Sequence, residues 1–109
     1  MEAKDKLKNI NGRLVNLFKA NQSTMMAFKG LTDSVNKDGA VSHKMKELVA
    51  VAIAVATKCD DCILYHLDAA KKHGATREEV IDVLSVTVEM AGGPGAVYAS
   101  KALEYYDSL

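Results

Sequence analysis

The amino-acid sequence predicts an all-α fold of about five to six helices, arranged as a single domain over residues 1–109. Apolar side chains recur at helical spacing along most of the chain. Only the stretch 48–56 could form a strand, and no second credible strand exists to pair with it. The single proline, Pro94, lies between two glycines after a long apolar run, as in a break between helices.

Composition excludes several classes of function. The 14 basic and 14 acidic residues balance and tryptophan is absent, so neither a basic surface nor an aromatic platform for nucleic acid is expected. The polar segment 1–10 lacks the apolar region of a signal peptide, and the longest apolar run is far shorter than the ~20 residues that span a bilayer. We therefore expect a cytoplasmic protein that binds neither nucleic acid nor membrane.

The first forty residues predict two helices and a turn. Apolar positions over 2–20 suit an amphipathic helix. Asn21 or Ser23 could cap a second helix, and residues 36–39 have the composition of a turn. The apolar residues expected on the inner side of the second helix are Met25, Met26, Phe28, Leu31 and Val35.

Residues 42–57 can be interpreted in two ways. The β-branched residues of 48–56 alternate with alanines, which favours a buried strand, and a strand before a Cys-x-x-Cys helix would resemble thioredoxin. We predict a helix instead, because 44–48 has helical character and runs directly into the apolar stretch, and because Ser42 is a suitable N-cap. Such a helix is apolar on every side and must be buried all round, so a partner subunit is expected to cover part of it.

Three more segments complete the prediction. A helix over about 59–73 ends at Gly74, and Thr76 with Glu79 forms a capping box for the next helix. That helix ends at the glycine-rich stretch 92–95, and Pro94 then begins a final helix. Because 80–90 is also very apolar, it is a second candidate for a subunit interface.

The only two cysteines of the chain, Cys59 and Cys62, form a Cys-x-x-Cys pair at the start of a predicted helix. His66 lies one helical turn beyond Cys62, and a base beside a thiol promotes the thiolate at neutral pH. A dithiol that cycles to a disulfide usually has this spacing. Two other interpretations are a pair of small buried side chains and a zinc site that also uses Glu47.

Glu47, twelve positions before Cys59, completes a pattern with Cys59, Cys62 and His66. This pattern resembles the signature of the alkylhydroperoxidase D-like branch of the carboxymuconolactone decarboxylase family, and the likeness extends over roughly 42–105. The resemblance implies an all-helical fold, a homotrimer or homohexamer, and reduction of a peroxide or disulfide with an external dithiol as reductant. It also implies that Glu47 orients or charges His66.

Asp61 departs from the peroxidase pattern, which carries a second histidine at that position. Carboxylates at Asp60 and Asp61 disfavour a nearby thiolate, although both suit a helix N-terminus and Lys58 partly offsets their charge. Tyr65 could hydrogen-bond at the site or serve only in packing. Lys44 and Lys46 could compete for the charge of Glu47, and His43 and His73 are expected to be surface or capping residues.

The predicted function is therefore a cytoplasmic thiol oxidoreductase without metal or cofactor. Glu47, Cys59, Cys62 and His66 are the predicted catalytic residues, and Asp61 and Tyr65 are possible modulators. The helix terminus favours Cys59 as the first nucleophile and the base favours Cys62; Cys59 is expected to be the more exposed. Two alternatives are a lactone decarboxylase that uses acid–base residues alone, and a non-enzymatic subunit with a vestigial site.

Overall fold

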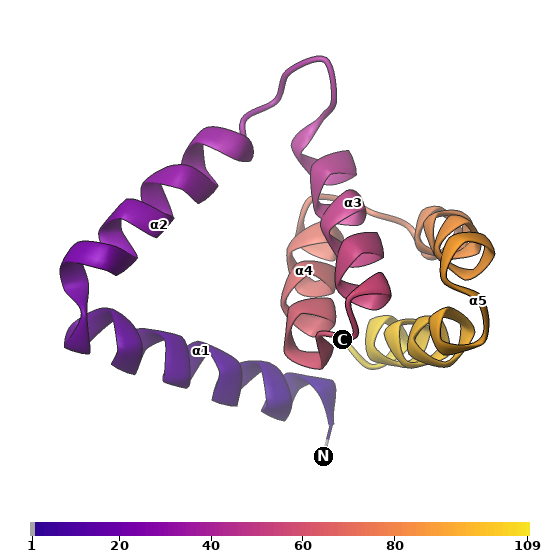
Figure 1. The fold of residues 1–109 in the computed structure, drawn as a ribbon, viewed down its shortest axis with the longest axis horizontal. Coiled ribbons are helices and arrows are strands. Elements are labelled where there is room, and N and C mark those ends of the chain that lie inside the picture. Colours follow the sequence, from indigo (N-terminus) through magenta and orange to yellow (C-terminus); the bar gives the residue numbers. More distant parts are fainter. Residues whose placement is uncertain (1) are drawn as a thin grey trace.

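The computed structural model describes residues 2–109, which form five helices and no strand. The helices are α1 (Ala3–Ala20), α2 (Gln22–Val35), α3 (His43–Ala56), α4 (Asp60–Lys72) and α5 (Arg77–Ser108). The all-α prediction is confirmed, and residues 48–56 are helical. Figure 1 shows α3, α4 and α5 packed together, whereas α1 leads away from them to α2.

The hydrophobic core forms where α3, α4 and α5 meet. Each helix contributes side chains that are completely or almost completely buried, and burying each contributes about 1.5–3 kcal/mol. The largest of them are Leu48, Val51 and Val55 in α3, Ile63, Leu64 and Leu67 in α4, and Val80 in α5. This core fixes α3 against α4. These two helices, together with Cys59 at the N-cap of α4, carry the predicted catalytic residues.

The helix ends follow the sequence signals in most places. Ser42 accepts a hydrogen bond from the backbone of Met45, and Thr76 forms the predicted capping box with Glu79. Gly74 has a positive φ of 90°, which suits glycine after a helix. The predicted side-chain cap of α2 is wrong: the helix begins at Gln22, and Asn21 makes no capping hydrogen bond through its side chain.

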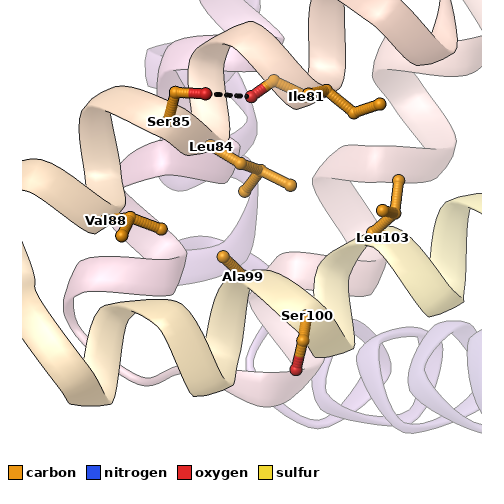
Figure 2. A pocket seen from close by; sticks show the side chains of 7 residues that line it. All are labelled: Ile81, Leu84, Ser85, Val88, Ala99, Ser100 and Leu103. Carbon is orange, nitrogen blue, oxygen red and sulfur yellow. Dashed lines mark hydrogen bonds between the residues drawn. The ribbon is translucent and has the colours of Figure 1, made fainter.

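Helix α5 bends sharply at Gly92, so the predicted break at 92–95 is confirmed. Gly92 has φ 69° and ψ −148°, a conformation that is essentially restricted to glycine. A Cβ at Gly95 would lie only 2.7 Å from the Cβ of Ala91. The bend brings the two halves of α5 together around a cleft of about 380 Å³, and Figure 2 shows side chains from both halves lining it.

The bend also bears on whether α5 could cross a membrane. Within residues 2–109, α5 is the one helix long and apolar enough to do so by length and composition. Helices of soluble proteins meet the same criteria. Gly92 divides α5 into two segments that are each shorter than the ~20 residues a bilayer requires.

Many apolar side chains stay exposed on this chain. The prediction that α2 has an inner, buried side is wrong for the isolated chain. Helix α2 packs only against α1, apart from one hydrogen bond from Lys46 to its last residue, and none of its residues is fully buried. Helix α3 was expected to need cover from a partner subunit, and in the single chain Val49 and Ile53 are at least half exposed. The reason is that α4 and α5 cover only part of its surface.

Candidate redox site

Cys59 and Cys62 are joined by a disulfide at the N-terminus of α4, with their Cα atoms 5.2 Å apart. Cys59 occupies the N-cap position, and its backbone N–H donates to the carbonyl of Ala54 at 3.0 Å. This bond draws Cys59 towards the end of α3 and leaves it half-buried, whereas Cys62 lies in the first turn and is exposed. The expectation that Cys59 is the more exposed cysteine is therefore wrong.

His66 and Glu47 come together from neighbouring helices. The Nδ1 of His66 in α4 lies 2.9 Å from the Oε2 of Glu47 in α3. Glu47 is only 3% exposed, while the imidazole is half-buried. An ionised carboxylate can only accept hydrogen bonds, so the proton of the neutral imidazole belongs on Nδ1. The Nε2 atom of His66 is then the one that can act as a base.

A second histidine shares the same carboxylate. The Nε2 of His43 lies 3.3 Å from the Oε1 of Glu47, so the prediction that His43 is a surface or capping residue is wrong. Its ring stacks at 3.9 Å on that of His73, whose Nδ1 donates to the carbonyl of Ala69 near the end of α4. The spacing of four between His43 and Glu47 on a helix was the sequence signal for this contact.

The two histidines determine the ionisation of Glu47. Burial by itself raises the pKa of this carboxyl, but hydrogen bonds and charge interactions with His66 and His43 outweigh burial and leave the pKa below its ordinary value. Glu47 is thus a buried carboxylate. Lys44 and Lys46 do not compete for it. Lys44 pairs with Glu79 at 2.9 Å, and Lys46 donates to the carbonyls of Val35, at the end of α2, and of Lys37 in the loop that follows.

Asp60 connects three helices beside the disulfide. Its carboxylate pairs with Lys6 of α1 at 3.0 Å and with Lys101 of α5 at 2.9 Å, and it accepts a hydrogen bond from the Tyr105 hydroxyl. Burial raises the pKa of Asp60, but bonds from Lys101, Lys6 and Tyr105 outweigh it and lower this pKa to about 2. Asp60 was expected to disfavour a nearby thiolate and to suit the helix N-terminus, and its role as a link between helices was not predicted.

Asp61 pairs with Arg13 of α1 at 2.5 Å, on the exposed side of the site. Each aspartate next to the cysteines therefore has a cationic partner. The expected effect of two carboxylates against a thiolate is offset for this reason. Sequence spacing could not reveal the partners, because they lie on helices far away along the chain.

The rings of Tyr65 and His66 make an edge-to-face contact, with their centroids 5.4 Å apart. Its hydroxyl forms no hydrogen bond with any residue in 2–109, and its ring faces an apolar groove between α1 and α2. The geometry favours packing as its role in the chain.

Other parts of the molecule offer less chemistry. In the described range, 2–109, no three His, Cys, Asp or Glu side chains are arranged to hold a metal ion. The cleft between the halves of α5 contains none of the predicted catalytic residues (Figure 2). Its two serine hydroxyls, Ser85 and Ser100, donate to carbonyls of their own helix.

Comparison with known proteins places this chain in a family. The sequence profile of the carboxymuconolactone decarboxylase family matches residues 22–105. An uncharacterized protein of Cupriavidus necator is 46% identical over 108 residues, covering 99% of this chain and 96% of that protein. An uncharacterized protein from the cox locus of Paracoccus denitrificans is 39% identical over 83 residues, covering 76% of this chain and 75% of that protein.

Solved structures give the same result. An apo crystal structure of a carboxymuconolactone decarboxylase family protein from Legionella pneumophila superposes with a TM-score of 0.92 at 39% identity, covering 96% of this chain and 94% of that one. A family member from Thermotoga maritima shares the fold with a TM-score of 0.82 at 24% identity, covering 94% of this chain and 87% of that one. That protein is described as possibly involved in an antioxidative response. The chain belongs to the carboxymuconolactone decarboxylase family.

Proposed function

We propose that this protein is a cytoplasmic thiol oxidoreductase that reduces a peroxide or a disulfide through Cys59 and Cys62. The observation that carries the proposal is the position of the Cys59–Cys62 bridge, one helical turn before a histidine that is held by a buried carboxylate. A structural disulfide needs no such base, and a dithiol that cycles between redox states does.

The reduced form requires a thiolate, and Cys62 is the better candidate for it. Cys62 is exposed and lies four residues before His66 on the same helix, whereas Cys59 is half-buried. With its Nδ1 proton donated to Glu47, His66 can accept the proton of Cys62 at Nε2. The nearby α4 N-terminus also favours negative charge on the sulfur.

The peroxide reaction then proceeds in two steps. The Cys62 thiolate attacks one peroxide oxygen and the O–O bond breaks, so that the leaving alkoxide takes the proton from His66 and departs as an alcohol. Cys62 becomes a sulfenic acid. The Cys59 sulfur next attacks the Cys62 sulfur and displaces hydroxide, which leaves as water with the Cys59 proton. The product is the disulfide between the two cysteines.

An external dithiol completes the cycle. Its thiolate attacks the exposed Cys62 sulfur, and its second thiol resolves the mixed disulfide. Two electrons and two protons thereby return to Cys59 and Cys62. With a disulfide substrate the same exchange runs in the opposite direction. A reducing compartment such as the cytoplasm would supply the dithiol.

Family membership supports this proposal but is compatible with other chemistry. A lactone decarboxylase could use Glu47 and His66 without sulfur chemistry, and a non-enzymatic subunit would use none of these groups. An antioxidative function for this chain would be consistent with the fold it shares with the Thermotoga maritima protein. Because the two alternatives need no redox change at the cysteines, a measurement of thiols separates them from the proposal.

The test is a stoichiometric oxidation of the reduced protein. Each chain should lose two free thiols and two hydrogens by mass spectrometry after one equivalent of an organic hydroperoxide, with the oxidant converted to the alcohol. Addition of a dithiol should restore both thiols and support repeated turnover. Cys62→Ser should form no alcohol, whereas Cys59→Ser should form one equivalent and stop at the sulfenic acid. Oxidation to a sulfinic acid without an intramolecular disulfide would contradict the cycle.

A further inference from the structure

The turn that joins α3 to the redox site contains a lysine in a backbone conformation that favours glycine. Lys58 has φ 59° and is the one non-glycine residue in 2–109 with a positive φ. Its N–H donates to the carbonyl of Val55 at 3.2 Å, and the N–H of Cys59 donates to the carbonyl of Ala54 at 3.0 Å. These two bonds form a Schellman motif, in which Lys58 takes the left-handed position that glycine usually occupies.

The turn itself does not require a lysine at this position. Glycine adopts the left-handed conformation without a clash, whereas a Cβ makes it unfavourable. The side chain of Lys58 is exposed and forms no hydrogen bond or ion pair with any residue in 2–109, so no polar contact offsets the strain. A strained residue beside a functional site indicates that its side chain has a role there.

The other charged groups next to the two cysteines are already paired. Asp60 and Asp61 each form ion pairs with cations of other helices, and these cations are Lys6, Arg13 and Lys101. Together with Lys58, the group has four cations against two carboxylates and a net charge of +2. The ammonium of Lys58 is the charge in this group that remains available to an anion from outside the chain.

We infer that Lys58 gives the redox site a preference for oxidants that carry a carboxylate. This inference rests on the proposed function, because it concerns the peroxide or disulfide that Cys62 reduces. Lys58 directly precedes Cys59, which is bonded to Cys62, and both Lys58 and Cys62 are exposed. A thiolate repels a negatively charged oxidant, and a cation on the same surface offsets that repulsion and attracts the oxidant. A neutral oxidant is not affected in this way.

The test compares two small disulfides of similar size and different charge. Dithiodiglycolate carries a carboxylate at each end, and bis(2-hydroxyethyl) disulfide is neutral. With either one, the Cys62 thiolate attacks one sulfur and expels a thiolate, and Cys59 then attacks the Cys62 sulfur and expels the second half as a thiol. The disulfide is reduced to two thiols while Cys59 and Cys62 are oxidised. The measured quantity is the rate constant for dithiodiglycolate divided by that for the neutral disulfide, at low ionic strength.

Lys58→Gln removes the charge and keeps a side chain at the strained position. It should lower this ratio roughly 3–10-fold by slowing only the reaction with dithiodiglycolate, whereas Lys58→Arg should keep the wild-type ratio. Added salt should lower the ratio in the wild type more than in Lys58→Gln. Lys37→Gln is the matched control and should leave the ratio unchanged, because Lys37 is exposed in the loop at the opposite end of α3 (Figure 1).

Lys58→Gly tests the strain and the charge in one variant. It should lower the ratio as Lys58→Gln does, and it should raise the midpoint of urea unfolding of the oxidised protein by about 0.3–0.7 M. A chain that becomes more stable and less selective is the result expected if the lysine is kept for its charge. A lower midpoint would show that the lysine stabilises the turn, and would overturn the inference.

The remaining outcomes separate this inference from the proposed function. If Lys58→Gln slows both disulfides equally, Lys58 acts on the Cys62 thiolate; if it slows neither, Lys58 is only a solvated side chain. Either result would overturn the inference and leave the proposed function standing. If the reduced wild type forms no bridge between Cys59 and Cys62 with either disulfide, the proposed function is wrong and the inference falls with it.

Discussion

At the scale of single residues, Glu47 is the centre of the site because its two oxygens have separate histidine partners. Oε2 contacts His66 at 2.9 Å and Oε1 contacts His43 at 3.3 Å. A buried carboxylate without partners would take up a proton, and these two contacts keep its pKa below the ordinary value. The ionised carboxylate in turn keeps the proton of His66 on Nδ1.

The first prediction concerns His66 as the base for Cys62. In the reduced wild type, alkylation of Cys62 should reach half its maximum rate below about pH 8.5, the value of a free thiol. His66→Ala should move this midpoint upwards and slow peroxide turnover by roughly 10²–10⁴-fold. Glu47→Gln should act in the same direction but less strongly, because it changes the partner of the base and leaves the base in place.

The control for this prediction is Asp68→Asn, since Asp68 lies on the same helix and its ion pair is with Lys72. Its alkylation profile should match the wild type. If the profiles of His66→Ala and wild type superimpose between pH 5 and 10, His66 has a structural role only.

The second prediction concerns His43, which we regard as a positioning residue. In His43→Ala, Glu47 loses one hydrogen bond, burial raises its pKa, and it takes up a proton at a higher pH than in the wild type. The rate of Cys62 alkylation should therefore fall relative to the wild type, and the deficit should grow as the pH decreases. His43→Gln keeps an N–H donor without the titrating ring and should restore most of the rate. An equal loss at every pH would indicate a general structural effect.

At the scale of secondary-structure elements, the bend of α5 depends on two glycines for different reasons. Gly92 supplies a backbone conformation that other residues avoid, and Gly95 allows the second half of the helix to approach Ala91. The bend packs the two halves of α5 against each other and brings Lys101 and Tyr105 to Asp60. A straight α5 would remove these contacts from the α4 N-terminus.

The third prediction follows from this bend. Gly92→Ala and Gly95→Ala should each lower the free energy of unfolding by about 1–3 kcal/mol, the first through backbone strain and the second through overpacking. Gly12→Ala is the matched control, because no atom lies within 4 Å of the added Cβ and the position is inside α1. Alanine should stabilise that helix by about 0.5–1 kcal/mol. Urea denaturation would measure the free energy of unfolding of the three variants, which should fall at Gly92 and Gly95 and rise at Gly12. Equal changes at all three positions would contradict the explanation.

At the scale of the whole molecule, Asp60 links the N-terminal helix to the core. It joins α1 through Lys6, α5 through Lys101 and Tyr105, and it begins α4 beside the disulfide. Through these bonds α1 is fixed relative to the redox site.

The fourth prediction is the pH dependence of stability that Asp60 causes. Its pKa is lowered from an ordinary value of 3.8 to about 2, so its stabilising contribution is complete above about pH 4 and is lost as the pH falls through about 2. After allowance for partial exposure, Asp60→Asn should lower the free energy of unfolding by about 1–2 kcal/mol at pH 7.

The difference between Asp60→Asn and the wild type should disappear near pH 2, as measured by denaturant unfolding at several pH values. Asp33→Asn is the control, because Asp33 forms only an exposed pair with Lys29 and should change stability by at most about 0.5 kcal/mol. A difference that stays constant from pH 7 to pH 2 would mean that the effect of Asp60 is not electrostatic.

Local patterns in the sequence were sufficient to predict the helical fold, the capping signals at Ser42 and Thr76, the break at 92–95 and the family. These features depend on local periodicity, on backbone conformation and on a motif with fixed spacing, all of which are present in the order of the residues. The spacing also placed His66 one turn beyond Cys62. The roles of Glu47, Cys59, Cys62 and His66 remain predictions, and the partner of His66 is the one the resemblance implied.

Which side chains meet across helices became known from the three-dimensional structure, because these contacts depend on helix packing. His43 joins Glu47 and stacks on His73, Asp60 and Asp61 meet cations from α1 and α5, and Cys62 rather than Cys59 is exposed. It also showed that, among residues 2–109, α1 is the only helix packed against α2 and that no residue of α2 is fully buried. Sequence periodicity tells which side of a helix is apolar, but not what packs there, because packing partners are set by how distant helices are placed in space.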